Sequence, residues 1–176
     1  MEQDLKKLIR KAKNGNVDAF SALITMYKGQ VFRHAYAMVN DRMEAEDIAQ
    51  EAFVKAYYSL SKLDHEYAFV SWLTRIVTNL CYDRLKKIQK KTSMQTEIDE
   101  QEVSKSASNI EQANMRIQLQ EAMKKLSPEH RSVLVLRDIQ GYSYDEIAKI
   151  VDIPLGTVKS RINIARKILK NELSRG

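Results

Sequence analysis

The side chains best placed to do chemistry are hydrogen-bond donors that recur at helical spacing near the C-terminus. Lys, Ser and Asn can read base edges in a major groove, and Arg and Lys can also neutralise phosphates. The residues predicted to contact DNA are Lys159, Ser160 and Asn163 for base edges, Arg161, Arg166 and Lys167 mainly for phosphates, and Thr157 at the start of the helix. The opposite face is apolar and is predicted to pack on a scaffold. Its members are Val158, Ile162, Ala165 and Leu169.

The segment before this helix carries helix-start and turn signals in close succession. The pair Ser127-Pro128 is typical of a helix N-terminus. Ser143 and Glu146 have the spacing of a capping box, which predicts the start of a short helix. Residues 152–154 form a turn signal directly before the basic helix. A short helix, a tight turn and a longer basic helix together predict a helix-turn-helix.

A second basic segment lies in the N-terminal half. Residues 75–91 carry six basic side chains against one acidic, the same counts as residues 156–176. Two such segments suggest two contacts along one polyanion, although two ordinary solvated helix faces give the same pattern. Asn79 lies at the edge of an apolar stripe, so its amide can point toward a ligand. Trp72 falls on the stripe and is expected in the core.

The preceding predicted helix carries the opposite charge. Residues 41–51 hold five acidic side chains against one basic. An acidic shoulder beside Phe53 comprises Glu46, Asp47, Gln50 and Glu51. DNA is repelled by such a surface, so we interpret it as the binding face for a protein partner with basic residues. A solvated amphipathic helix is the alternative interpretation.

Hydrophobic spacing predicts an all-α protein. Apolar residues recur every three or four positions through residues 45–60 and 67–90, and no useful stretch of the N-terminal half alternates with period two. Shorter helices are predicted upstream, the first ending near Gly15, the second near Gly29 and a third covering residues 31–39.

The polar centre of the chain predicts a linker between two small helical domains. Residues 92–109 are mostly Ser, Thr, Gln and Glu, and such a composition cannot bury enough apolar surface to offset the entropy of ordering. The predicted division is an N-terminal domain, 1–91, a flexible acidic linker, 92–113, and a C-terminal helix-turn-helix domain, 114–176.

Composition excludes several classes of protein. The 176 residues include 29 Lys and Arg against 23 Asp and Glu, a net charge of +6, and a single cysteine, so an intrachain disulfide framework or a multi-cysteine zinc site is excluded. That cysteine, Cys81, falls on an apolar stripe and is expected to be a buried hydrophobe. No apolar run is long enough to span a bilayer and no signal peptide is evident, so we expect a cytoplasmic protein. The three histidines lack a consistent partner and no phosphate-binding loop occurs, so we expect no catalysis, metal or cofactor.

Three segments carry motifs of a known family: EAEDIAQEAFVKAY at 44–57, FVSWLTRIVTNLCYDRL at 69–85 and YSYDEIAKIVDIPLGTVKSRI at 142–162. They resemble, in order, the core-polymerase-binding, −10-reading and −35-reading segments of bacterial extracytoplasmic-function (ECF) sigma factors. The resemblance implies a subunit that binds core RNA polymerase and directs it to promoters, contacting double-stranded −35 DNA and single-stranded −10 DNA. It also implies control by an anti-sigma factor and no small-molecule substrate.

The resemblance also implies roles for individual residues. The residues that dock on the polymerase would be Asp47, Gln50, Glu51 and Phe53. Asn79, with the loop from Leu63 to Phe69, would capture a flipped base of the −10 element. The nearby DNA backbone would be held by Arg84, Lys86 and Lys87. Lys159 stands where the family often has Arg, which keeps the charge and loses the bidentate fork for guanine.

A helix-turn-helix repressor or activator is the main alternative. Such a protein needs a dimerisation surface and a ligand-binding or phosphoacceptor domain, and the N-terminal half indicates neither. The acidic shoulder and the helix that carries Asn79 would have no use in a repressor, so these two features distinguish the alternatives.

Overall fold

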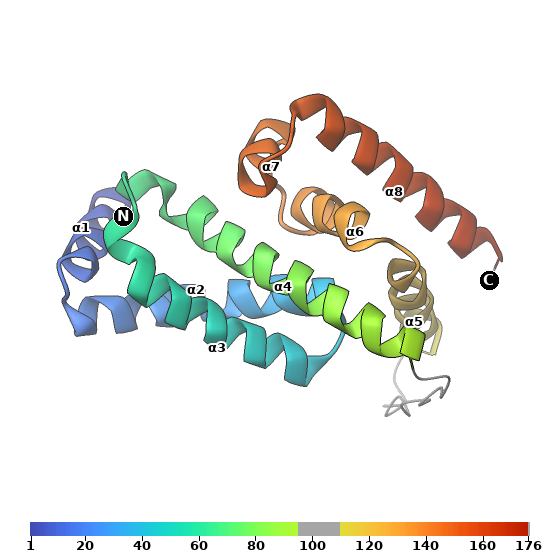
Figure 1. Ribbon diagram of the computed structural model, residues 1–176, viewed down its shortest axis with the longest axis horizontal. Coiled ribbons are helices and arrows are strands. Elements are labelled where there is room, and N and C mark those ends of the chain that lie inside the picture. Colours follow the sequence, from blue (N-terminus) through green and yellow to red (C-terminus); the bar gives the residue numbers. More distant parts are fainter. Residues whose placement is uncertain (95–109, 176) are drawn as a thin grey trace.

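The computed structural model describes residues 1–94 and 110–175, and within these ranges every regular element is a helix (Figure 1). The N-terminal half contains α1 (Glu2–Lys13), α2 (Val17–Val39), α3 (Arg42–Ser59), the short 3₁₀ turns η1 (Leu60–Lys62) and η2 (Glu66–Ala68), and α4 (Phe69–Met94). The C-terminal half contains α5 (Ile110–Lys124), α6 (Pro128–Leu134), the π-helical segment η3 (Val135–Ile139), α7 (Tyr144–Val151) and α8 (Leu155–Arg175). The all-α prediction is confirmed. None of the described helices has the length and hydropathy that a bilayer-spanning segment requires.

In the N-terminal half α2 packs against α1, α3 and α4, and α3 also packs against α4. The buried face of α3 consists mainly of small side chains, and this allows the neighbouring backbones to approach closely. The fully buried members of this face are Ala45, Ile48, Ala52 and Ala56. Polar side chains cap the preceding turns: Asn16 accepts a hydrogen bond from the Ala19 amide, and Asp41 accepts one from the Glu44 amide. Trp72 is half-buried and packs against this core, as expected.

Helix α2 runs without interruption through Gly29, so the prediction of two helices separated near that residue is wrong. A glycine inside a helix costs about 1 kcal/mol relative to alanine. Apolar side chains on both sides of it, including Leu23 and Val31, are buried in the same core. Tertiary packing therefore holds the helix together across a residue that local propensity alone marks as a stop.

The C-terminal half has the predicted helix-turn-helix. Ser127 caps α6 through its hydroxyl, and Ser143 and Glu146 form the complete capping box that starts α7. Asp152 adopts the left-handed conformation with φ 56°, which ends α7 and turns the chain into α8. The expected helix after Ser127 differs in one respect: α6 continues into the π-helical η3, which ends at Ile139. Gly141, with φ of +77°, lies in the turn that follows.

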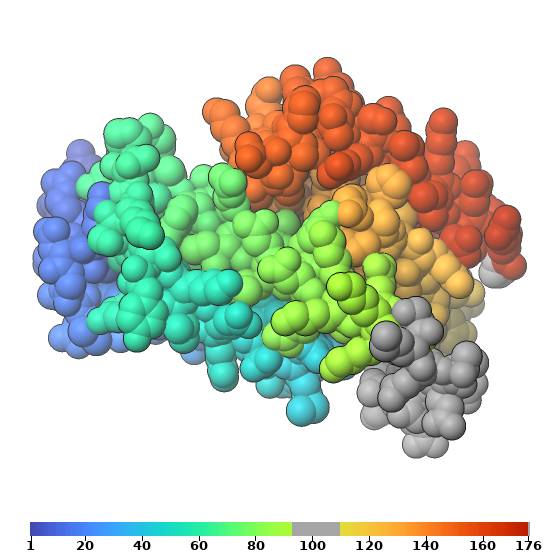
Figure 2. Space-filling view, viewed as in Figure 1, coloured from blue at the N-terminus to red at the C-terminus, as the bar shows by residue number. Residues whose placement is uncertain are grey.

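The two halves pack directly on one another, and Figure 2 shows the orange and red C-terminal half resting on the green surface of α4. Val135 of η3 is fully buried within the hydrophobic core of the N-terminal half. Tyr142 contacts Thr74 across the interface, with 2.9 Å between the hydroxyl oxygens. Because Thr74 already donates to the Val70 carbonyl, Tyr142 is the donor of this second hydrogen bond.

A buried arginine joins the halves at a second point. Arg131 of α6 donates to the carbonyl of Met38 at 2.7 Å and to that of Leu126 at 3.1 Å. The Met38 carbonyl belongs to the last turn of α2, where the helix dipole favours a cation. Arg131, which belongs to the C-terminal half, thus donates a hydrogen bond to a carbonyl at the end of a helix in the N-terminal half.

The expected linker 92–113 overlaps described helices at both ends. Helix α4 continues to Met94 and α5 begins at Ile110, so these flanking residues are helical. The remaining residues of the predicted linker, 95–109, lie outside the described residues.

Candidate nucleic-acid interface

Helix α8 presents a polar, mostly basic face opposite a buried apolar one. Val158, Ile162 and Ala165 are fully buried and Leu169 is half-buried, as predicted, which fixes the rotation of the helix. The predicted contact residues that are exposed are Lys159, Ser160, Asn163, Arg166 and Lys167, whereas Thr157 and Arg161 are half-buried. The exposed members lie on consecutive turns of one helix, which is the arrangement that can enter a major groove.

Two arginines of α8 have partners within the chain. Arg166 pairs with Asp138 of η3, with 2.7 Å between Nη2 and Oδ1, and the hydrogen bond to Asp138 raises the pKa of Arg166. Arg161 lies close enough to Glu129 and Tyr82 to influence the pKa of both. Arg161 is thus directed toward the junction with α4, and part of its charge is already balanced there.

Helix α4 carries the predicted −10 residues on a surface beside the C-terminal half. Asn79 is exposed, and within the described residues its amide has no hydrogen-bond partner. Lys86 is exposed and places its Nζ 4.2 Å from the centre of the Tyr82 ring, while Lys87 is exposed without a partner among the described residues. Burial, followed by the hydrogen bond to Glu129, raises the pKa of Tyr82 to about 12.

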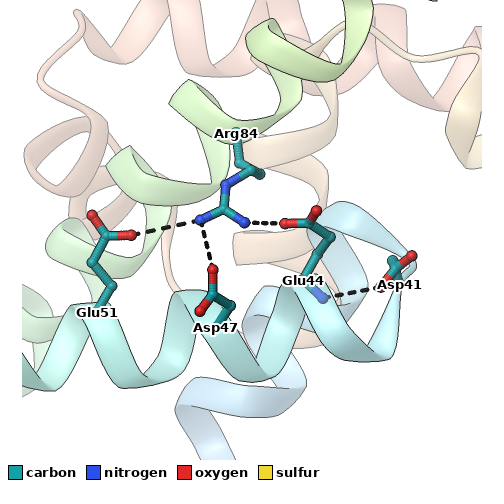
Figure 3. A network of polar contacts seen from close by, with 5 residues as sticks. All are labelled: Asp41, Glu44, Asp47, Glu51 and Arg84. Atoms are coloured by element: carbon teal, nitrogen blue, oxygen red, sulfur yellow. Dashed lines mark hydrogen bonds and ion pairs between the residues drawn. The ribbon is translucent and has the colours of Figure 1, made fainter. Parts of the chain in front are cut away.

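Arg84 does not share this exposed position. Its guanidinium points into α3 and contacts three carboxylates, as Figure 3 shows. It donates hydrogen bonds to Glu44 and to Asp47, the latter over 3.3 Å, and lies 3.6 Å from Glu51. Burial alone would lower the pKa of Arg84, but the bonds and charges of Glu44 and Asp47 raise it overall. The structure therefore brings Arg84 to the acidic shoulder instead of to the exposed basic surface.

The acidic shoulder is exposed along α3, with one exception among the predicted docking residues. Asp47, Gln50 and Glu51 are exposed, consistent with a surface that a partner can reach. Phe53 is 9% exposed and belongs to the core of the N-terminal half. The expectation that Phe53 contacts the polymerase therefore does not fit its placement, because its ring packs inward beneath α3.

The loop before α4 is held by its buried ends. Leu63 and Phe69 are both buried, so neither offers its side chain to a base. Tyr67 and His65 are exposed in this loop, and their rings stack with 5.1 Å between the centroids. Lys13 of α1 donates to the Leu63 carbonyl and helps to hold the loop in place.

Sequence reasoning missed the buried polar groups at the interface between the halves. Arg131 stands among the polar residues Glu129, His130 and Ser132, and its contact with Met38 spans 93 residues, so no local pattern indicates its burial. His34 is likewise buried, and burial lowers the pKa of its imidazole to about 4. Cys81 is buried as predicted, and its pKa is raised by burial to about 12, which leaves the thiol protonated. Within the described residues no group of three His, Cys, Asp or Glu side chains is arranged to hold a metal ion.

Each half of the chain matches a known protein family. The family description Sigma-70 region 2 matches residues 23–91, and Sigma-70, region 4 matches residues 116–169. The ECF RNA polymerase sigma factor SigW of Bacillus subtilis is 37% identical to this chain, and the alignment covers 98% of each protein. The RNA polymerase sigma-H factor of Pseudomonas aeruginosa is 32% identical over 98% of this chain and 94% of its own length.

Solved structures share the arrangement of helices. CnrH, solved in complex with the cytosolic domain of CnrY, aligns with a TM-score of 0.70 at 26% identity over 97% of both chains. The sigma factor RpoE from Bartonella quintana, solved in complex with the anti-sigma factor NepR, aligns with a TM-score of 0.71 at 22% identity. That alignment covers 90% of this chain and 98% of the RpoE chain, and it shows a common fold.

The helix-turn-helix with its basic face, together with a second helical domain that has acidic and basic surfaces, defines a two-domain DNA-binding transcription factor. Both halves match sigma-factor regions, and the relatives align along nearly the whole chain. The chain belongs to the family of ECF RNA polymerase sigma factors. Its function is to bind core RNA polymerase and promoter DNA in transcription initiation.

Proposed function

We propose that this sigma factor divides promoter recognition between α8 and α4. The exposed residues of α8 would read the −35 element as duplex, with Lys159, Ser160 and Asn163 on base edges. Arg166, Lys167 and the half-buried Arg161 and Thr157 would engage the adjoining backbone. The observation that carries this assignment is the exposed basic face of a capped helix-turn-helix whose opposite face packs inward through Val158, Ile162 and Ala165.

At the −10 element, the proposed contacts come from exposed groups of α4. The exposed amide of Asn79, which has no partner in the part of the chain that the structure describes, lies beside the basic end of the helix and can hydrogen-bond an unstacked base. Lys86 and Lys87 would neutralise the neighbouring phosphates. Opening a base pair costs a few kcal/mol, and capture of the flipped base offsets part of that cost. None of these steps requires bond chemistry from the chain.

Core RNA polymerase would dock on the acidic shoulder of α3. Asp47, Gln50 and Glu51 are exposed on this helix, and their charge complements basic residues of a partner. Two weak promoter contacts then become one strong interaction because the polymerase fixes the separation of the domains.

The cellular location and the control of this activity are inferred from its polymerase partner and from a related complex. A polymerase subunit that acts on promoter DNA works in the cytoplasm. CnrH, which is 26% identical to this chain, was solved in complex with the cytosolic domain of CnrY. We expect this chain to be held inactive by an anti-sigma factor.

A run-off transcription assay tests the proposal. Purified chain is added to bacterial core polymerase that lacks any sigma factor, on a pool of genomic promoter fragments. Specific transcripts that appear when the chain is added would support promoter recognition and reveal both elements. If the chain binds DNA alone but starts no transcription, the repressor alternative takes precedence.

The docking surface has a separate test. Asp47→Lys with Glu51→Lys reverses two charges on exposed positions, so the fold should persist while co-purification with core polymerase is lost. Asp83→Lys on α4 reverses one charge at an exposed position elsewhere and serves as the control for each single substitution. Undiminished co-purification of the double variant would rule out docking at this surface.

A further inference from the structure

Three carboxylates of the acidic shoulder and its first turn lie on one face of α3. Glu44, Asp47 and Glu51 are spaced three and four residues apart, so they are neighbours on the helix surface. Like charges at this spacing repel one another and favour side-chain conformations that point apart. A common orientation of the three groups therefore needs a cation between them.

Arg84 supplies that cation from the neighbouring helix. Its guanidinium donates to Glu44 and Asp47 and lies 3.6 Å from Glu51, so one side chain contacts all three carboxylates (Figure 3). Arginine presents five donors in a rigid plane, and this geometry suits several acceptors at once. Asp41 fixes the same turn by capping the Glu44 amide.

The exposure of the four side chains is unequal. The Arg84 side chain is 21% exposed, whereas those of Glu44, Asp47 and Glu51 are 36%, 67% and 46% exposed. A carboxylate has about four acceptor positions, and Arg84 uses a fraction of them. The cation is thus covered while the carboxylates keep acceptor positions on the solvent side.

We propose that Arg84 is a positioning residue for the polymerase-docking surface and is not a contact for promoter DNA. It holds the α3 carboxylates in one orientation and reduces their mutual repulsion, so that a basic segment of core polymerase meets a prearranged set of acceptors. The proposal rests on the proposed docking function of α3. A phosphate is disfavoured at Arg84 because three carboxylates lie within 4 Å of it.

The test compares Arg84→Gln with Lys87→Gln in the full chain. Both remove one positive charge from α4, but Lys87 is exposed and has no partner among the described residues. Two affinities are measured: that of the chain for core polymerase, and that of the assembled holoenzyme for a −10 single strand. Arg84→Gln should weaken polymerase binding by about tenfold and leave strand affinity within about twofold, with the reverse pattern for Lys87→Gln.

Conservative rescue and a double-mutant cycle separate positioning from a general loss of stability. Arg84→Lys keeps a cation without the fork and should recover part of the polymerase affinity. In an Asp47→Asn and Glu51→Gln background, Arg84→Gln should cost much less, because two of the three carboxylates that it positions are no longer charged. An equal cost in both backgrounds would show that Arg84 acts through stability alone and would overturn the proposal.

Other outcomes are equally decisive. Unchanged polymerase affinity in Arg84→Gln together with weaker strand binding would make Arg84 a DNA contact and reject positioning. If Asp47→Lys with Glu51→Lys leaves polymerase binding intact, the docking surface itself is wrong, which is distinguishable from a failure at Arg84 alone.

Discussion

Helices α4 and α8 are both expected to contact promoter DNA, yet their surroundings differ. Helix α4 is contacted by the carboxylates of α3 on one side and by Tyr142 and Glu129 of the C-terminal half on another. Helix α8 has an apolar buried face and a broad exposed face, where Asp138 partners Arg166. A residue on the exposed face of α8 can therefore specialise in DNA, whereas most positions on α4 also support the fold.

This difference has a practical consequence for interpreting substitutions. Changes on the outer face of α8 should alter promoter choice with little effect on stability, because they remove no packed contact. Changes on α4 should more often lower stability as well, because residues such as Thr74 and Tyr82 bond to the C-terminal half. The four predictions below test the contrast, from the largest expected effect to the smallest.

The contrast is tested most strongly at the centre of the α8 face. Lys159→Ala with Asn163→Ala removes two proposed base contacts, each worth about 1–3 kcal/mol, so run-off transcription from a −35-dependent promoter should fall by on the order of tenfold or more. Core polymerase affinity should be unchanged. Lys170→Ala, which removes a charge from an exposed later turn, is the matched control. Loss of polymerase binding in the double variant would contradict the separation of functions.

A buried histidine that contacts α4 should make the free energy of unfolding depend on pH. His34 donates from Nε2 to Thr78, 3.1 Å away, because Thr78 already donates to the Thr74 carbonyl. The unfolded chain binds a proton to this histidine near pH 6.5, while the folded pKa is about 4, so stability falls as the pH drops through this window. Between pH 7.5 and 5 the expected loss is about 2 kcal/mol in urea unfolding.

The variant that isolates this effect is His34→Gln, which keeps a donor for Thr78 and cannot titrate in this range. Its unfolding free energy should fall less between pH 7.5 and 5 than that of the unmodified chain. His65→Gln, at an exposed position, should retain the full pH dependence. Identical profiles for all three proteins would show that His34 is not responsible.

The hydroxyl of Tyr142 should contribute a smaller amount at the junction with α4. Tyr142→Phe removes the hydrogen bond to Thr74 and should lower the free energy of unfolding by about 1 kcal/mol. The change is measured as a shift in Tm. Tyr67→Phe removes a hydroxyl from an exposed ring and should leave Tm unchanged. A larger shift in the control than in Tyr142→Phe would argue against a stabilising contact across the interface.

The smallest effect is expected at the ion pair on α8. Asp138→Asn releases Arg166 and removes a negative charge beside the DNA-reading face, so affinity for −35 duplex should rise by about threefold at low salt. Stability should change by at most a few tenths of a kcal/mol because the pair is exposed. Asp83→Asn, a similar charge change on α4, controls for the effect of net charge. Weaker duplex binding by Asp138→Asn would show that Asp138 positions Arg166 for DNA.

The features that sequence predicted well are those set by neighbouring residues. The caps at Ser127 and Ser143, the turn near Asp152 and the rotation of α8 all depend on signals within a few positions. Long-range contacts were not predicted. The bond between Arg84 and Glu44 joins residues 40 apart, so no periodicity shows that two oppositely charged surfaces meet there. Gly29 is the reverse case, since packing overrides a local stop signal.

The buried position of Val135 couples the two halves, although the C-terminal half also has a hydrophobic core of its own. Sequence families describe the halves as separate regions, but this side chain from η3 lies inside the core of the N-terminal half. Neither half can then lose its structure without exposing apolar surface in the other, so unfolding should be one cooperative transition with a single m-value that reflects the whole surface. We therefore expect the two halves of the free sigma factor to unfold together, even though their sequences match two separate family models.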